Sequence, residues 1–159
     1  MRTVIFPGSF SPPTLGHLNI IEKASTLFDL VYVAIGRNGQ KPSSPFSFQE
    51  RLNMLEKMTT HLSNINIISF DGMLITLAKQ LSVSTIVRSL RGVSDFEYEC
   101  MQAHMNKELG KIETLFLLPD QQYRHISSSF VRELCQQGFP ISRFVPQEIE
   151  KMILNAWHA

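Results

Sequence analysis

A histidine near the start of a predicted helix forms the first candidate site of the chain. The segment TLGH, residues 14–17, follows an irregular loop rich in proline, glycine and serine after a short apolar run. Thr14 can cap the helix, so His17 falls in its first turn, where unpaired N–H groups and the helix dipole attract anions. Gly16 has no Cβ, so a ligand can approach the backbone closely. This combination predicts a phosphate site.

Cations and hydroxyls follow other predicted strands. Arg88 and Arg91 share one short loop, and Lys41 lies in another. Guanidinium groups suit phosphate oxygens, although charges in loops are usually solvated. Three serines, residues 127–129, open a predicted helix, where hydroxyls cap by default and can also cradle a phosphate. No GxGxxG and no Walker lysine motif is present, which argues against a dinucleotide-binding or P-loop protein.

Short apolar runs alternate with helical patterns and must position these loops. The runs are mostly continuous, as expected for parallel strands covered on both faces; they span residues 3–6, 30–35, 65–70, 85–87 and 114–118. The helical patterns span residues 14–28, 47–60 (starting in a capping box), 72–81, 94–109 (stopping at Gly110), 128–137 (before Gly138) and a sixth helix with Pro146 in its first turn.

This alternation predicts an α/β fold, a Rossmann-like, doubly wound, five-stranded parallel sheet in a single domain, residues 1–159. Ligands of such sheets bind at the carboxyl ends of the strands. Function is therefore expected in the loops after residues 6, 35, 70, 87 and 118.

Composition narrows the class of protein. The 159 residues suit one domain, and the formal net charge of +1 argues against a general nucleic-acid binder. No apolar run approaches the roughly 20 residues of a membrane span, and the first residues lack a secretion signal. The two cysteines, Cys100 and Cys135, have no metal-ligand spacing, which is typical of reduced cytoplasmic thiols. We therefore expect a cytoplasmic protein without nucleic-acid or membrane partners.

Four segments carry a resemblance to a known family. Residues 14–17 match the (T/H)xGH signature of the nucleotidyltransferase superfamily. The segments PGSF at 7–10, RSLRGVSDFEYE at 88–99 and ISSSFVR at 126–132 narrow the field. Nearly the whole chain resembles bacterial phosphopantetheine adenylyltransferases. The family normally has glycine at the position of Ser89, so the chain departs from the pattern there.

The resemblance implies transfer of AMP from ATP to 4′-phosphopantetheine, which yields 3′-dephospho-coenzyme A and pyrophosphate. It makes His17 and Lys41 the catalytic residues. It assigns the acceptor to Ser9, Lys41, Leu74 and Arg88. It assigns ATP to Ser9, Phe10, His17, Ser89, Leu90, Arg91, Glu99, Tyr123, Arg124, His125, Ile126, Ser127, Ser128 and Ser129.

The resemblance also implies Mg²⁺ and a homohexamer. Mg²⁺ would bridge ATP oxygens with few protein ligands, so no protein metal site is expected. Two alternatives stay open. One is another small nucleotidyltransferase, acting on nicotinate mononucleotide or glycerol phosphate, against which the 88–99 segment argues. The other is a nucleotide-binding module without catalysis.

Overall fold

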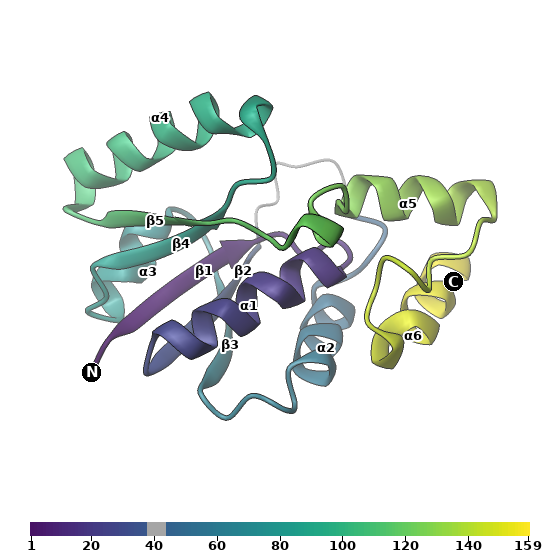
Figure 1. Cartoon of the computed structure of the whole chain (residues 1–159). Helices are drawn as coiled ribbons and strands as arrows, with labels where there is room; N and C mark the ends of the chain where they lie inside the picture. Colours follow the sequence, from purple (N-terminus) through teal and green to yellow (C-terminus); the bar gives the residue numbers. More distant parts are fainter. Residues whose placement is uncertain (38–43) are drawn as a thin grey trace.

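The computed structural model describes residues 1–37 and 44–159, and its centre is a five-stranded sheet (Figure 1). All strand pairs are parallel, in the order β3-β2-β1-β4-β5. The sequence-predicted fold class is confirmed. The strands are β1 (Thr3–Gly8), β2 (Leu30–Gly36), β3 (Ile65–Phe70), β4 (Thr85–Ser89) and β5 (Glu113–Leu117).

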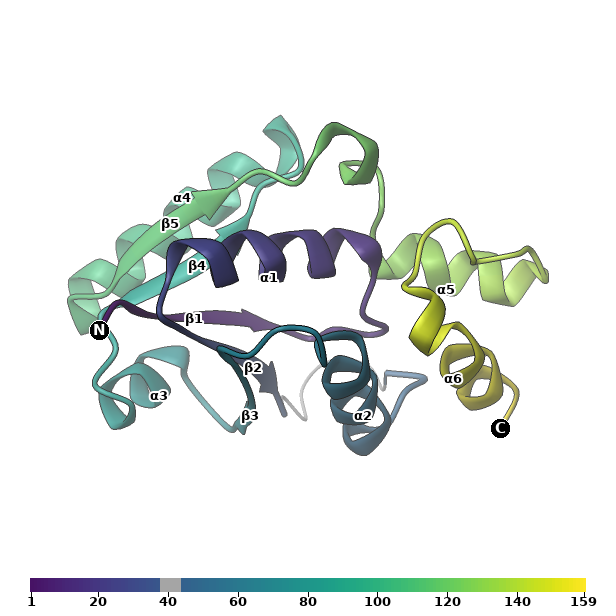
Figure 2. The ribbon, with the colours of Figure 1, turned by 60° about the horizontal axis from the view of Figure 1, so that its bottom comes forward.

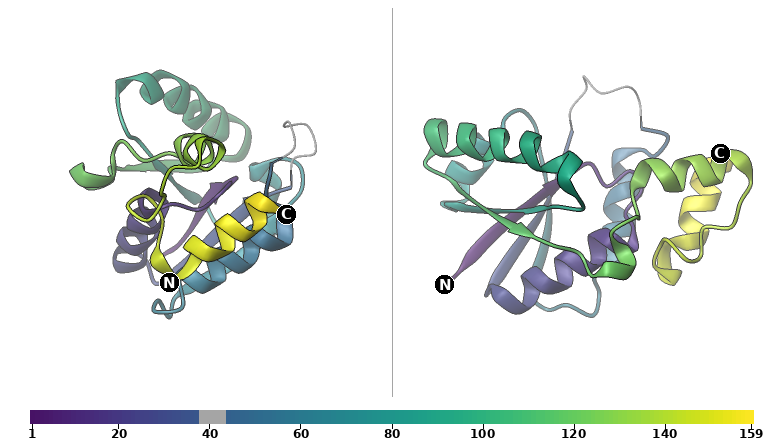
Figure 3. Two further views of the ribbon diagram at one scale, coloured as in Figure 1. Left: turned by 90° about the vertical axis from the view of Figure 1, so that its right-hand side faces the viewer. Right: turned by 45° about the horizontal axis from the view of Figure 1, so that its top comes forward.

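All six predicted helices are present. Their bounds are α1 (Leu15–Leu27), α2 (Phe48–Met58), α3 (Leu74–Gln80), α4 (Val93–Gly110), α5 (Ser128–Gln137) and α6 (Gln147–His158). A short 3₁₀ helix, η1 (Gln121–Tyr123), was not predicted. Helices α3 and α4 lie on one face of the sheet and α1 on the other (Figure 2). Helix α2 contacts β3 and joins the core on the α1 face of the sheet, and α6 packs side by side with α2 (Figure 3).

Alternate side chains of each inner strand enter two separate cores. In β1, Val4 and Phe6 pack with α1, whereas Ile5 packs with α3. In β4, Val87 joins the first core and Ile86 the second. These side chains are at most 3% exposed. Burial on both faces is why the strands read as continuous apolar runs.

Polar caps determine where the helices begin. The hydroxyls of Thr14, Ser47 and Ser127 each accept a backbone N–H three residues later, as the sequence indicated for these helix starts. Pro146 is the N-cap of α6, one residue before the predicted first-turn position. In the described part of the chain, no helix has both the length and the apolar character needed to span a bilayer.

Helix α4 ends at Gly110, as predicted, but the glycine does not serve as the predicted stop signal. Gly110 is the last helical residue, and Lys111 adopts the left-handed conformation after it, with a φ of 54°. A Cβ at Gly110 would lie 2.8 Å from Cγ2 of Ile75. Glycine is therefore required there for close packing of α4 against α3, and not for the turn that ends the helix.

A second close approach shapes the loop after β1. A Cβ on Gly8 would lie 2.9 Å from Cζ of Phe10. The Phe10 ring is 1% exposed and is held between Phe6 and His17, at centroid distances of 5.6 and 5.0 Å. The ring has no room to move away, so glycine at position 8 allows the loop to fold back on the strand.

We predict that Gly8→Ala lowers the free energy of unfolding by about 1–3 kcal/mol, the usual effect of overpacking a filled core. Gly16→Ala is the matched control, since its Cβ would meet its neighbours at ordinary distances of 3.5 Å or more. The control should unfold like the wild type in urea, measured by circular dichroism without ligand. Equal destabilisation by both substitutions would contradict this account of Gly8.

Candidate active site

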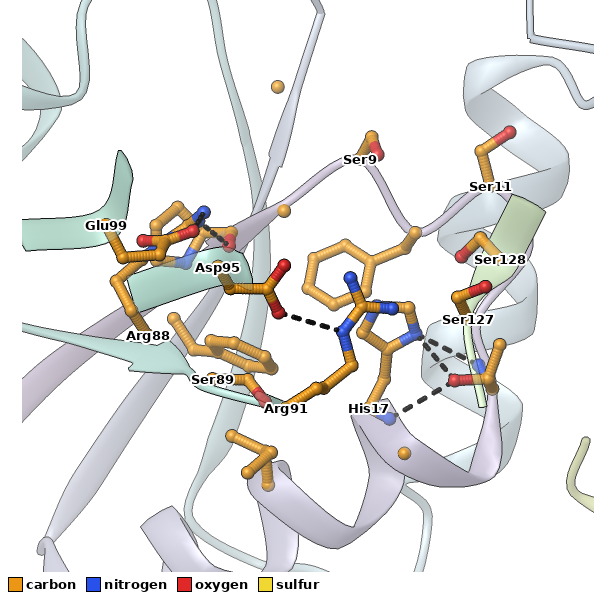
Figure 4. A pocket seen from close by; sticks show the side chains of 18 of the residues that line it. Ser9, Ser11, His17, Arg88, Ser89, Arg91, Asp95, Glu99, Ser127 and Ser128 are labelled. Atoms are coloured by element: carbon orange, nitrogen blue, oxygen red, sulfur yellow. Dashed lines mark hydrogen bonds and ion pairs between the residues drawn. The ribbon is translucent and has the colours of Figure 1, made fainter. Parts of the chain in front are cut away.

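A cleft of about 1400 Å³ opens at the carboxyl ends of the strands (Figure 4). Its walls come from the loops after β1, β3 and β4 and from the starts of α1 and α5. Strands β1 and β4 are neighbours in the sheet but far apart in sequence. Ligands of open α/β sheets bind at such a switch in strand order. The position of the cleft thus agrees with the loops expected from the sequence to carry function.

His17 is fixed at the start of α1 by a reciprocal cap. Its Nδ1 accepts the backbone N–H of Thr14 at 3.1 Å, while the Thr14 hydroxyl accepts the His17 N–H at 3.3 Å. The histidine thus has the place that Glu or Gln has in an ordinary capping box. Because Nδ1 is an acceptor, the neutral ring carries its proton on Nε2. The side chain lines the cleft and can offer that N–H to a ligand.

The protonation state of His17 follows from its surroundings. Desolvation, and to a lesser extent the nearby positive charge of Arg91, together lower the pKa of the imidazole from 6.5 to about 4. The Arg91 side chain points toward His17 in the cleft (Figure 4). His17 is therefore a neutral hydrogen-bond donor at pH 7, and the cationic charge beside it belongs to Arg91.

Arg91 is only loosely held, which leaves its guanidinium available to a ligand. Its Nε lies 3.4 Å from Oδ2 of Asp95, one turn further along the chain, and its side chain is 43% exposed. The Arg91 carbonyl accepts the Arg124 Nε at 3.2 Å. Arg124 therefore supports the loop from its exposed side.

Arg88 and Glu99 form a bidentate ion pair at the end of β4. Arg88 Nε and Nη2 donate to the two oxygens of Glu99 at 2.8 and 2.6 Å. Its Nη1 donates to the carbonyl of Pro7 at 3.2 Å, which ties β4 to β1. Glu99 is 8% exposed, so its carboxylate is buried and not a solvated group on the helix surface. Both residues line the cleft, with their charges compensating each other.

The serine run forms the opposite wall. Ser127 caps α5 by accepting the Phe130 N–H at 3.1 Å, and its hydroxyl lies 3.1 Å from that of Ser129. The Ser128 hydroxyl donates to the carbonyl of Pro12 at 2.7 Å. This bond joins the start of α5 to the loop after β1. The free N–H groups of the first turn of α5 are thereby placed beside that loop, as an anion site requires.

Two arginines that the sequence reasoning did not single out hold the same loop. Arg51 Nη1 donates to the carbonyl of Ser9 at 2.7 Å, and Arg132 Nη1 donates to that of Ser11 at 2.5 Å. Both arginines line the cleft. Arg132 lay inside a quoted motif without an assigned role. Arg51 carried one signal, since a cation in the first turn of a helix opposes the helix dipole.

A hydrogen-bonded cluster of Asn19, Lys23 and Asp120, which the sequence reasoning also missed, fixes the segment before α5. Asn19 and Asp120 exchange two hydrogen bonds, at 2.8 and 2.9 Å, although 101 residues separate them. Lys23 contacts the Asp120 carboxylate at 2.7 Å. The Lys23 and Asn19 donors lower the pKa of that carboxyl. The cluster ties η1 to α1, so Tyr123 and His17 keep a fixed relation.

Most of the sequence-predicted site residues meet in the cleft. Those that line it are Ser9, Phe10, His17, Leu74, Arg88, Ser89, Arg91, Glu99, Tyr123, Ile126, Ser127, Ser128 and Ser129. Leu90, Arg124 and His125 are not among its lining residues, and the His125 ring packs edge-on against Phe144. Lys41 lies outside the described residues. The ligand roles of all these residues stay predictions.

The cleft carboxylates bear on the expected Mg²⁺. Within residues 1–37 and 44–159, no three His, Cys, Asp or Glu side chains gather as a metal site. Asp95 and Glu99 line the cleft, and each contacts an arginine. This donor set fits an ion held mainly by triphosphate oxygens and water, which is the way Mg²⁺ commonly binds with nucleotides.

Known proteins are similar to this chain in sequence and in fold. Residues 5–134 match the Cytidylyltransferase-like family model. The phosphopantetheine adenylyltransferase of Finegoldia magna is 47% identical over 147 residues, 92% of this chain and 90% of that protein. That of Caldanaerobacter subterraneus subsp. tengcongensis is 42% identical over 156 residues, 98% of this chain and 97% of that protein.

A solved structure has a similar fold. It is a Vibrio parahaemolyticus protein provisionally assigned as a nicotinate-nucleotide adenylyltransferase, with a TM-score of 0.66. It is 22% identical and covers 98% of this chain and 100% of its own, so it supports the fold alone. Sequence similarity over nearly the whole chain is the stronger finding, and by it the chain belongs to the phosphopantetheine adenylyltransferases, within the cytidylyltransferase-like family.

Proposed function

We propose that the protein transfers the adenylyl group of ATP to 4′-phosphopantetheine, forming 3′-dephospho-coenzyme A and pyrophosphate. The observation that carries this proposal is the convergence of His17, Arg91 and the serine-rich start of α5 on one cleft. These groups come from three loops at the same edge of the sheet. The choice of 4′-phosphopantetheine as the acceptor is supported by the name that the chain's relatives share, phosphopantetheine adenylyltransferase.

The chemistry requires little from acid–base groups. A phosphate monoester is already ionised at neutral pH, so its oxygen can attack the α-phosphorus of ATP without a general base. The bond from that oxygen to phosphorus forms while the bond to the pyrophosphate oxygen breaks. Orientation of the reactants and stabilisation of negative charge on the α-phosphate therefore dominate catalysis.

Each element of the site has a place in that scheme. The Nε2–H of His17 donates to an α-phosphate oxygen as charge develops there. Arg91 and the first-turn groups of α5, with Ser128 and Ser129, hold the β- and γ-phosphates. Ser9 orients the attacking phosphate. By resemblance, Lys41 and Arg88 are assigned to the acceptor, and Lys41 together with His17 stabilises the α-phosphorus during transfer.

The proposal also includes a metal ion, an oligomeric state and a cellular location. Mg²⁺, when bound through the triphosphate, neutralises part of its charge. A homohexamer is supported by exposed apolar side chains along α4: Phe96, Tyr98, Met101, Met105 and Leu109. A cytoplasmic location is supported by two free cysteines, Cys100 and Cys135. The chain is proposed to act as one domain.

Pyrophosphate release tests the function directly. With ATP and Mg²⁺, we expect rapid pyrophosphate release on addition of 4′-phosphopantetheine. Nicotinate mononucleotide with ATP, and glycerol phosphate with CTP, should give at least about 100-fold less kcat/KM, because these acceptors carry the phosphate but lack the pantetheine arm that would position it in the cleft. Equal rates with another acceptor would reject the proposed substrate. ATP binding without release for any acceptor would indicate a non-catalytic module.

Removal of the His17 imidazole should slow the chemical step. Loss of one well-placed donor costs about 3–4 kcal/mol of transition-state stabilisation. His17→Ala should therefore lower kcat by roughly 10²–10³, while calorimetry still detects ATP binding and circular dichroism a folded chain. Near-normal turnover would remove His17 from the mechanism.

The half-buried neutral imidazole also makes stability depend on pH. The unfolded chain binds a proton at position 17 below pH 6.5, whereas the native state does so only below about 4. The free energy of unfolding should thus fall as pH falls through this window. His17→Gln keeps the capping box without titrating. Between pH 7 and 4, the wild type should lose roughly 3 kcal/mol more than this variant, since one pKa unit corresponds to about 1.4 kcal/mol. Parallel urea-derived curves would show that His17 titrates normally.

A further inference from the structure

Arg51 is a buried cation without a carboxylate partner. It is 9% exposed. In the part of the chain that the structure describes, no Asp or Glu lies within ion-pair distance of it, and the sequence has neither residue type between positions 38 and 43. A charge removed from water normally requires such a partner. Arg51 is therefore an exception among the buried residues.

Its position adds a second unfavourable contribution. Arg51 is the fourth residue of α2, close to the end where the helix dipole is positive. Desolvation lowers the pKa of its guanidinium, which again reflects a cost for the charged form. Neither effect stabilises the fold. Residues that cost stability in this way are most often retained for function.

The contacts of Arg51 indicate what that function is. Its Nη1 donates to the carbonyl of Ser9 at 2.7 Å, and its Nε to that of Ser47, the N-cap of α2, at 3.4 Å. The guanidinium thus joins the loop after β1 to the start of α2. Ser9 and Arg51 both line the cleft.

The peptide that Arg51 holds is an unusual one. It leads into Phe10, whose φ of 47° is rare for a bulky residue and persists only where surrounding contacts impose it. In a planar trans peptide the carbonyl and the N–H point in opposite directions. A cation that fixes the Ser9 carbonyl therefore also fixes the Phe10 N–H and polarises it as a donor.

We propose that Arg51 is a positioning residue for adenylyl transfer, which fixes the Ser9–Phe10 peptide so that both residues meet the reacting phosphates in one orientation. The proposal rests on the proposed function of the cleft. Arg51 acts through the loop and need not touch either substrate. Errors of about 1 Å in such positioning can cost about 100-fold in rate.

Removal of the Arg51 charge should lower turnover without weakening ATP binding, and a lysine at this position should restore turnover. Arg51→Gln removes the charge and most of the reach, so kcat should fall at least about 30-fold while the calorimetric Kd of ATP stays within about threefold. Arg51→Lys keeps a charged donor and should recover kcat to within about fivefold of the wild type. Lys57→Gln, the same change on the exposed side of α2, is the control and should behave like the wild type.

Amide hydrogen exchange supplies a readout that needs no turnover. In R51Q, the amides of residues 8–11 should exchange at least about tenfold faster, since their restraint is lost. R51K and K57Q should match the wild type. The Tm of R51Q should stay within about 3 °C, because the lost bond and the removed buried charge offset each other.

Several results would overturn the positioning role. Unchanged exchange in R51Q would do so whatever its kcat, and so would turnover within about threefold of the wild type. An equal loss of ATP affinity and turnover, or failure of R51Q to fold, would make Arg51 a general structural residue. A wild type that releases no pyrophosphate with phosphopantetheine would instead count against the proposed function, and the exchange experiment would still decide on Arg51.

Discussion

The hydrogen bond from the Thr14 backbone N–H to Nδ1 of His17 is the interaction on which the candidate site depends. It ends the loop after β1, begins α1 and selects the tautomer of the ring in one contact. The contact that caps the helix thus also fixes the imidazole for which we propose a role in catalysis. The imidazole lies at a helix N-terminus, where its neutral form can donate to an anion while the helix dipole adds a favourable positive potential.

The loop between β1 and α1 is held from all sides by residues distant in sequence. Arg51 of α2, Arg132 of α5 and the Ser128 hydroxyl bind three of its carbonyls. The Phe10 ring fills the core below it and forbids a side chain at Gly8. Such a loop loses little entropy when a ligand binds, which favours a site built for orienting two anionic reactants.

Local patterns were sufficient for most of the fold because each element carried its own signal. The apolar runs identified the strands, since burial on both faces removes alternation. The capping box at Ser47 and Glu50 located α2. Several element bounds differed from the predicted ones by one or two residues, and η1, the position of Pro146 and the role of Gly110 also departed from expectation. The helix η1 is too short for a period, and the role of Gly110 depends on Ile75 of another helix.

The parallel sheet, the loops at its carboxyl edge and the motif residues could all be predicted from the amino-acid sequence, because spacing and residue type carry that information locally. Three properties became visible only in the folded chain: the neutral state of His17, the pairing of Arg88 with Glu99, and the burial of Arg51. These properties depend on desolvation and on contacts between segments that lie far apart along the chain. A charge partner 11 residues away or a carbonyl 42 residues away leaves no periodic trace in the sequence.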